Sequence, residues 1–263
     1  MRIAHISDTH MMIPSADEPL GQARAENLSA AVAAINALTP AVDVVIHTGD
    51  VAQNRKAEEY ALAREILSDL TPPVYVVPGN RDCRTSLRRT FASDGYMTGE
   101  GDAAILYAID DLPVRLIGFD SQSGDQRKGD LDSARLQWLD DTLAQAPDMP
   151  SAILMHHPPI SINTSKFPWQ WTRDEVGPEL AAVLARHPQT MRIFCGHSHR
   201  DYCDHFGDVL VSTTPSIAVD LRLGDFAQED EDQPVFHLHT FETCIGFTSV
   251  SRISASRTAN AAE

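Results

Sequence analysis

Cysteine is scarce in this sequence and its few copies are scattered. The 263 residues include only Cys83, Cys195, Cys203 and Cys244, and no two of them form a C-x-x-C pair. A disulfide scaffold or a cysteine-type zinc site requires paired, regularly spaced thiols. Both classes are therefore excluded, and we expect four ordinary reduced thiols.

Long hydrophobic runs are also missing. No apolar stretch approaches the roughly 20 residues of a membrane-spanning helix. The segment Met1 to Ser7 resembles a strand and lacks the charged-then-apolar pattern of a signal peptide. We expect a cytoplasmic protein without a membrane partner.

Positive charge is in short supply. There are 21 lysines and arginines against 37 aspartates and glutamates, for a net charge of −16. Such a field repels phosphate backbones, so a nucleic-acid polymer is not an expected partner. The hydrophobic share of 43% in a chain of this length is enough for a core without a structural metal. Any metal site is therefore expected to be functional.

Hydrophobic periodicity predicts an alternation of strands and helices, typical of an α/β protein. The first five predicted elements are the strand Arg2–Ser7, the helix Leu20–Leu38, the strand Val42–His47, the helix Ala57–Leu70 and the strand Val74–Val77. The later ones are the antiparallel strand pair Ala103–Ala108 and Val114–Phe119, the helix Leu131–Ala146, the strand Ala152–Met155, the helix Asp174–Arg186, and the strands Met191–Cys195, Val209–Ser212, Pro234–Thr240 and Gly246–Val250. We expect one domain over residues 1–250 and a flexible C-terminal tail over 251–263.

Histidine, aspartate and asparagine gather directly after five of the predicted strands. The residues concerned are Asp8, His10, Asp50, Asn80, His156, His197 and His199. The carboxyl ends of parallel strands line one crevice of a sheet, so these side chains are expected to meet. Gly49, Gly79 and Gly196 precede several of them, and we expect each glycine to let the backbone turn sharply.

A mixture of imidazole and carboxylate suits Mn²⁺, Fe²⁺ or Fe³⁺, and Zn²⁺. Seven candidate ligands are too many for one ion with an open position, but they suit two. A carboxylate such as that of Asp50 can then bridge ions about 3.5–4 Å apart, with a shared water or hydroxide between them. Each motif alone is weak, because a single histidine at a strand end is more often a hydrogen-bonded structural residue than a ligand.

The ordered set of motifs is far more specific than its parts. It reads Asp8-Thr9-His10, Gly49-Asp50, Gly79-Asn80-Arg81-Asp82, His156-His157-Pro158-Pro159 and Gly196-His197-Ser198-His199. Over residues 2–216 this set resembles the calcineurin-like metallophosphoesterase family. The surroundings are most similar to the bacterial class III cyclic-nucleotide phosphodiesterases.

The resemblance implies a four-layer αββα sandwich, in which helices flank two mixed β-sheets, with a dinuclear metal site at the sheet ends. By the family pattern, one ion would be held by Asp8, His10 and His199, and the other by Asn80, His156 and His197. Asp50 would bridge the two ions.

Arg81 departs from the family pattern, which usually has histidine after the asparagine. An arginine cannot act as a general acid, but it can bind phosphate oxygens through two parallel hydrogen bonds. We therefore expect Asn80 and Arg81 to hold the phosphoryl group, and we take His157 as the candidate that protonates the leaving oxygen.

Three further residues are candidate substrate contacts. Arg84 and Arg200 either attract the phosphate or belong to ordinary solvated surface. Trp169 lies in an aromatic segment over residues 160–174, which either stacks on a nucleobase or packs against the sandwich or a second subunit of a homodimer.

The function expected from these residues is hydrolysis of small phosphodiesters, by in-line attack of a metal-bridging hydroxide. Cyclic nucleotides (2′,3′ or 3′,5′) rank ahead of glycerophosphodiesters as substrates. A pyrophosphohydrolase of nucleotide-linked lipids would share Arg81 but needs a longer apolar cap than residues 160–171 provide. A catalytically weak metal-binding scaffold is the remaining alternative, and retention of all seven candidate ligands argues against it.

Overall fold

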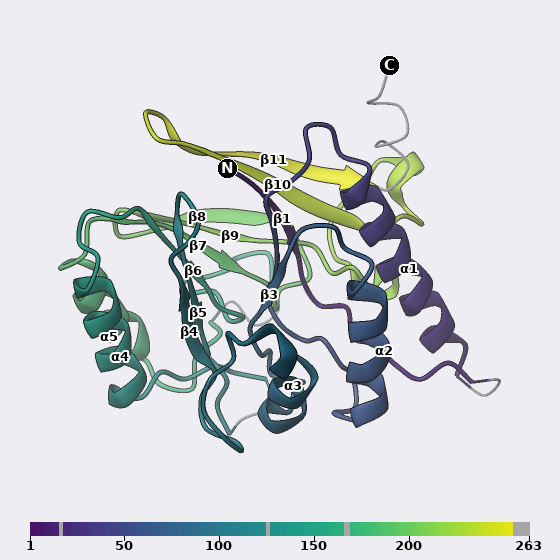
Figure 1. Ribbon diagram of the computed structural model, residues 1–263, viewed down its shortest axis with the longest axis horizontal. Helices are drawn as coiled ribbons and strands as arrows, with labels where there is room; N and C mark the ends of the chain where they lie inside the picture. The colour runs from purple at the N-terminus through teal and green to yellow at the C-terminus, as the bar shows by residue number, and fades with distance from the viewer. Residues whose placement is uncertain (16–17, 125–126, 166–168, 255–263) are drawn as a thin grey trace.

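In the computed structural model, two β-sheets pack face to face and helices cover their outer faces (Figure 1). The structure describes the chain except residues 16–17, 125–126, 166–168 and 255–263. The predicted four-layer αββα sandwich is confirmed. Within the described residues, no helix is both long and apolar enough to span a membrane.

The first sheet has the strand order β11-β10-β1-β2-β3. Its strands are β1 (Arg2–Ile6), β2 (Val44–His47), β3 (Val74–Val76), β10 (Val235–Glu242) and β11 (Gly246–Ser254). The helices α1 (Pro19–Asn36), α2 (Ala57–Leu67) and α3 (Arg84–Thr90) alternate with or follow β1, β2 and β3 in the N-terminal part of the chain. β1, β2 and β3 pair in parallel, as the predicted alternation of strands and helices requires.

The second sheet has the strand order β4-β5-β6-β7-β9-β8. Its strands are β4 (Leu106–Ile109), β5 (Arg115–Phe119), β6 (Ser151–Leu154), β7 (Thr190–Cys195), β8 (Tyr202–Phe206) and β9 (Val209–Thr213). β4 and β5 form the predicted antiparallel pair, and β5, β6, β7 and β9 run parallel. The helices α4 (Ser133–Ala144) and α5 (Val176–Leu184) pack their apolar side chains against this sheet.

The described residues also contain three short 3₁₀ turns. They are η1 (Ala92–Asp94), η2 (Val219–Leu221) and η3 (Gln228–Asp230). The hydrophobic core has one part between the first sheet, its helices and the inner face of the second sheet, and another part beneath α4 and α5. The two sheets touch where the ring of His5 on β1 packs edge-on against Phe194 on β7, with the centroids 5.5 Å apart.

Two expectations about secondary structure need correction. The strand β8 was not predicted, because it is an edge strand whose Cys203, Asp204 and His205 are exposed and give no hydrophobic alternation. The strand β11 continues to Ser254, four residues into the predicted tail, because its backbone pairs with β10 as far as Val235. The remainder of the predicted tail, residues 255–263, lies outside the described residues.

Candidate metal centre

The seven candidate ligands all follow strand ends, and the structure brings them together at one edge of the sandwich. Asp8 and His10 follow β1, Asp50 follows β2, Asn80 follows β3, His156 follows β6, and His197 and His199 follow β7. Because β1, β2 and β3 belong to one sheet and β6 and β7 to the other, the site spans both sheets. It depends on the packing of the two sheets, not on one sheet alone.

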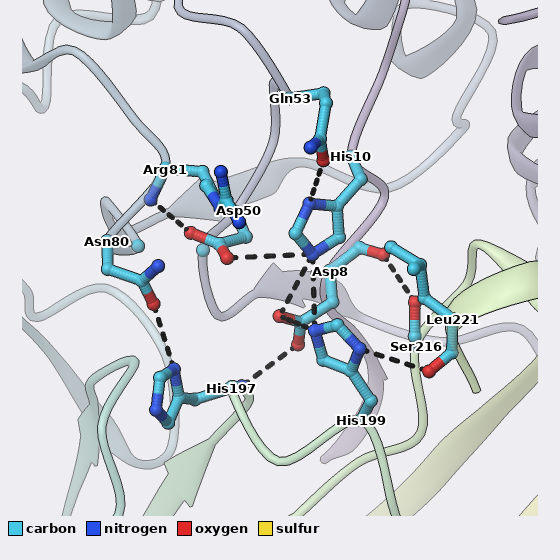
Figure 2. Close-up of polar contacts among 12 residues, drawn as sticks. Asp8, His10, Asp50, Gln53, Asn80, Arg81, His197, His199, Ser216 and Leu221 are labelled. Carbon is cyan, nitrogen blue, oxygen red and sulfur yellow. Dashed lines mark hydrogen bonds and ion pairs between the residues drawn. The ribbon is translucent and has the colours of Figure 1, made fainter. Parts of the chain in front are cut away.

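Asp8, His10, Asp50 and His199 form what we call the first ligand group (Figure 2). One ligand atom from each lies within 4.8 Å of the others. The Nε2 atoms of His10 and His199 are 3.2 Å apart, and Oδ1 of Asp8 lies 3.2 Å from Nε2 of His199. These donor atoms are close enough to share one ion.

Asn80, His156 and His197 form the second ligand group. Oδ1 of Asn80 lies 3.0 Å from Nε2 of His156 and 2.8 Å from Nδ1 of His197. The two ring nitrogens are 3.2 Å apart. The predicted division of the ligands into two sets thus corresponds to two clusters of side chains.

The carboxylate of Asp50 lies between the two groups. Its Oδ2 is 3.5 Å from Nε2 of His10, and its Oδ1 is 3.6 Å from Nε2 of His156. The backbone N–H of Arg81 donates to Oδ1 at 2.7 Å and fixes the carboxylate in this orientation (Figure 2). Each oxygen of Asp50 therefore faces a different ligand group.

Each histidine ligand uses its second ring nitrogen for a hydrogen bond to an outer partner, which fixes the ring and its tautomer. The pairs are His10 Nδ1 with Gln53 Oε1 (2.8 Å), His156 Nδ1 with the Thr48 carbonyl (2.7 Å), His197 Nε2 with Gln170 Oε1 (2.8 Å) and His199 Nδ1 with the Leu221 carbonyl (3.1 Å). None of these four partners is predicted by the sequence pattern. The two carbonyls carry no side-chain signal, and neither glutamine stands in a recognisable motif.

These outer hydrogen bonds leave a nitrogen lone pair of each histidine aimed at its ligand group. Lone pairs 3.2 Å apart repel unless a cation lies near both. The separation is close to the value of roughly 3.4 Å that follows for two nitrogens bound tetrahedrally at about 2.1 Å from one metal. Oδ1 of Asp8 is buried, and within the described residues its polar neighbours are the ring nitrogens of His199 and His10, at 3.2 and 3.7 Å, which belong to the same ligand group. The residues present therefore fit two divalent ions.

The carboxylate of Asp8 and the neighbouring imidazoles shift each other's pKa values. Burial alone would raise its pKa, but the imidazoles of His199 and His10 hold the pKa of this carboxyl well below its usual range. In return, although burial works against it, the Asp8 carboxylate raises the pKa of His199. Burial, with the neighbouring His156, lowers the pKa of His197 well below its usual value, which keeps this ring neutral as a metal ligand requires.

Most of the ligands sit on backbone that L-residues rarely adopt. Positive φ angles occur at Asp8 (55°), His10 (44°), Asp50 (54°), His197 (67°) and His199 (55°). Outside glycine, Arg55 is the sole further example within the described residues. Such conformations cost energy and persist only where the surroundings enforce them, which is typical of functional sites.

The glycines before the ligands serve two different purposes. Gly49 has a φ of 99°, as a sharp turn requires, whereas Gly79 and Gly196 do not have positive φ. At Gly79 an added Cβ would overlap the amide nitrogen and the carboxylate of Asp50, and at Gly196 it would overlap Ser7 Oγ. The expected sharp turn is present at both positions, because the carbonyl of Gly79 accepts from the N–H of Asp82 at 3.1 Å and that of Gly196 from the N–H of Ser198 at 2.7 Å. Glycine is needed there because other chain segments approach closely, not because φ is positive.

His157 lies beside the second ligand group, with its ring centroid 4.6 Å from that of His197. It is fully buried, and its Nδ1 is 2.9 Å from Oγ of Ser121. Burial first, and then the imidazoles of His197 and His156, lower the pKa of His157 well below its usual value. The structure thus favours a neutral ring here, which does not support the expected role of His157 as a proton donor.

The candidate substrate contacts differ in their placement. Arg81 is exposed next to Asn80, whereas the guanidinium of Arg84 is bound to the Asp120 carboxylate at 2.6 Å and lines a polar cavity of about 640 Å³. Arg200 donates to the carbonyl and hydroxyl of Thr164 at 3.1 and 2.9 Å. Trp169 packs against Gly177 of α5, 3.2 Å from the position of a Cβ there. Of the two readings of Trp169, the structure supports packing against the sandwich.

A family model described as calcineurin-like phosphoesterase matches residues 1–201. The chain belongs to the calcineurin-like phosphoesterase family. It is therefore a hydrolase of phosphoesters, and its His/Asp cluster corresponds to the metal site of a metallophosphoesterase.

Curated relatives of this calcineurin-like phosphoesterase are named as phosphodiesterases. A probable glycerophosphodiester phosphodiesterase GpdQ of Arcobacter nitrofigilis is 34% identical over 82% of this chain and 79% of the relative. The 3′,5′-cyclic adenosine monophosphate phosphodiesterase CpdA of Escherichia coli K12 is 27% identical over 84% of this chain and 78% of its own length. A dimetal phosphatase from Danio rerio shares the fold, with a TM-score of 0.65, 14% identity, and coverage of 96% of this chain and 99% of the other.

Proposed function

We propose that this protein is a dinuclear metal-dependent phosphodiesterase that hydrolyses small phosphodiesters. The observation that carries the proposal is the position of Asp50, whose two oxygens face the two ligand groups at 3.5 and 3.6 Å. A single ion would need only one of these groups.

Two divalent ions bound here would activate water and neutralise charge on the phosphoryl oxygens. The chain itself supplies orientation. The backbone N–H of Arg81 holds Asp50 in place, while its guanidinium makes no hydrogen bond or ion pair within the described part of the chain. That guanidinium serves to bind two phosphoryl oxygens at once and to offset the charge of the transition state. Asn80 contributes a neutral oxygen to the second ligand group.

The donor set of imidazole, carboxylate and one amide suits Mn²⁺, iron or Zn²⁺. Cyclic nucleotides, 3′,5′ or 2′,3′, are the first candidate substrates, in line with the name of the Escherichia coli relative. Glycerophosphodiesters are the second candidate, favoured by the name of the Arcobacter relative, which is more similar in sequence.

The test begins with protein stripped of metal by a chelator. Hydrolysis of bis-p-nitrophenyl phosphate is then measured after Mn²⁺, Fe²⁺ or Zn²⁺ is restored, for the wild type and for Asp50→Ala. We expect metal-dependent turnover in the wild type and its loss in the variant. Wild-type protein that binds two ions and hydrolyses no diester would refute the proposal and leave the scaffold alternative.

A substrate comparison follows with the most active metal. The values of kcat/KM for 3′,5′-cyclic AMP, 2′,3′-cyclic AMP and glycerophosphoethanolamine rank the candidates directly. A preference for the glycerophosphodiester would overturn the order proposed here.

A further inference from the structure

Arg24 of α1 is a buried cation that contacts the metal centre from outside the family motifs. Its side chain is 4% exposed, and its Nη1 donates to the backbone carbonyl of His10 at 2.9 Å. The remaining nitrogens bind Asp220 in η2, with Nε at 3.1 Å and Nη2 at 2.7 Å from the two carboxylate oxygens. One guanidinium thus joins α1, the segment after β1 and η2.

Asp220 connects this pair to the other side of the first ligand group. The next residue, Leu221, provides the carbonyl that accepts from Nδ1 of His199 at 3.1 Å (Figure 2). The N–H of Leu223 donates to the carbonyl of His199 at 2.8 Å. In the same segment, Oγ of Ser216 donates to the carbonyl of Asp8 at 2.7 Å. The segment over residues 216–223, which contains η2, therefore helps to fix two ligands, Asp8 and His199.

The residues held in this way are strained. Asp8, His10 and His199 all have positive φ angles, and such residues remain in place only when the surroundings fix them. The bidentate contact of Arg24 with Asp220 is the kind of directional bond that can do so. Lysine could not replace it, because a single ammonium cannot match the planar arrangement of donors.

The second ligand group is fixed by other residues. The ring of His156 is held by the carbonyl of Thr48, and the ring of His197 by Gln170. No hydrogen bond or ion pair joins Arg24 or Asp220 to these residues in the part of the chain that the structure describes. The direct contacts of Arg24 therefore reach the first ligand group, so its effect should fall mainly on one of the two ions.

Resting on the dinuclear function proposed above, we propose that Arg24 and Asp220 are positioning residues that selectively set the affinity of the first ligand group for its ion. Their loss leaves all seven ligands in the chain but loosens His10 and His199. Outer partners of metal ligands typically change metal affinity by about 10- to 100-fold, and we expect a change of that size for one ion.

The experiment is a Mn²⁺ titration of chelator-stripped full-length protein, followed by calorimetry and by metal content after dialysis. The variants are Arg24→Met, Asp220→Ala and the double variant, with Arg24→Lys as the version that keeps the buried charge. Arg64→Met is the matched control. Arg64 makes a similar bidentate pair with Asp94, with N···O distances of 2.7 and 2.9 Å, but neither residue is a candidate ligand. His199→Ala and His197→Ala identify which binding step belongs to which group.

We expect the step that disappears in His199→Ala to weaken about 10- to 100-fold in Arg24→Met and Asp220→Ala, with the other step unchanged. The double variant should resemble the single ones, because the two residues act as a unit. Gln170→Ala should instead weaken the step that disappears in His197→Ala.

An unchanged titration, or equal weakening of both steps, in variants that keep the wild-type circular dichroism spectrum would overturn the proposal. Should Arg24→Met fail to fold, Asp220→Ala and Arg24→Lys decide in its place, since Asp220 is 29% exposed and tolerates truncation better. Wild-type protein that takes up only one ion would refute the dinuclear function. A comparison of the affinity for that ion between the wild type and the Arg24 variants would still test the positioning role.

Discussion

Gly79→Ala is expected to damage the metal centre by steric overlap alone. Gly79 does not have a positive φ, so alanine meets no conformational penalty there. Its Cβ would overlap the amide nitrogen and Oδ1 of Asp50 and would lie 2.8 Å from Cγ of that carboxylate. Asp50 cannot easily retreat, because its carbonyl accepts from the N–H of His10 at 2.9 Å. Either the strand ends separate or the carboxylate moves.

The size of the effect follows from these contacts. Overpacking of a close-packed site costs about 1–3 kcal/mol. For a chain of this length each kcal/mol lowers the unfolding midpoint by about 2–4 °C, so a decrease of about 2–12 °C is expected. A displacement of a catalytic group by about 1 Å can reduce turnover by roughly 100-fold, and we expect at least that loss for bis-p-nitrophenyl phosphate.

Gly124→Ala provides the matched control. Among the described residues, no atom lies within 4 Å of a Cβ added at Gly124, and Gly124 has no positive φ. Thermal unfolding of metal-free protein and metal-restored turnover are measured for both variants. Wild-type stability and turnover in Gly79→Ala would refute the steric argument, as would an equal loss in Gly124→Ala.

Two further predictions concern ionisation. Because burial keeps His157 neutral, His157→Asn should leave the pH dependence of turnover between pH 5 and 9 unchanged, and loss of a titration in that profile would restore its role as an acid. In metal-free protein, burial and the nearby Asp50 raise the pKa of Asp82 to about 6, so the folded state binds this proton more tightly than the unfolded state. The contribution of Asp82 to stability is therefore full below about pH 4 and declines by about 3 kcal/mol as the pH rises past 6. Urea unfolding of the wild type and Asp82→Asn at pH 4.5 and 7 measures this, and parallel profiles would contradict it.

The sequence by itself determined most of the order of strands and helices, without β8 and α3, and named the seven candidate ligands. Hydrophobic periodicity is a local property, so β1, β2, β3 and the helices between them could be predicted from their own residues. Ligands such as Asp8 and His156 stand directly after strands, and the carboxyl ends of parallel strands share an edge. Their convergence therefore followed from chain order, and the family motifs then divided them into two sets.

Only the tertiary structure decided how those ligands are held and which neighbours are available to a substrate. Gln170 reaches His197, and Arg24 reaches Asp220 across 196 residues of sequence, through contacts that exist only once the two sheets have packed together. The structure adds that Arg84 pairs with Asp120 and that Trp169 packs against Gly177 of α5, whereas their contacts with substrate stay predictions. The sequence gives the chemical type of each side chain. Its contact partner depends on long-range packing, which no local sequence pattern predicts.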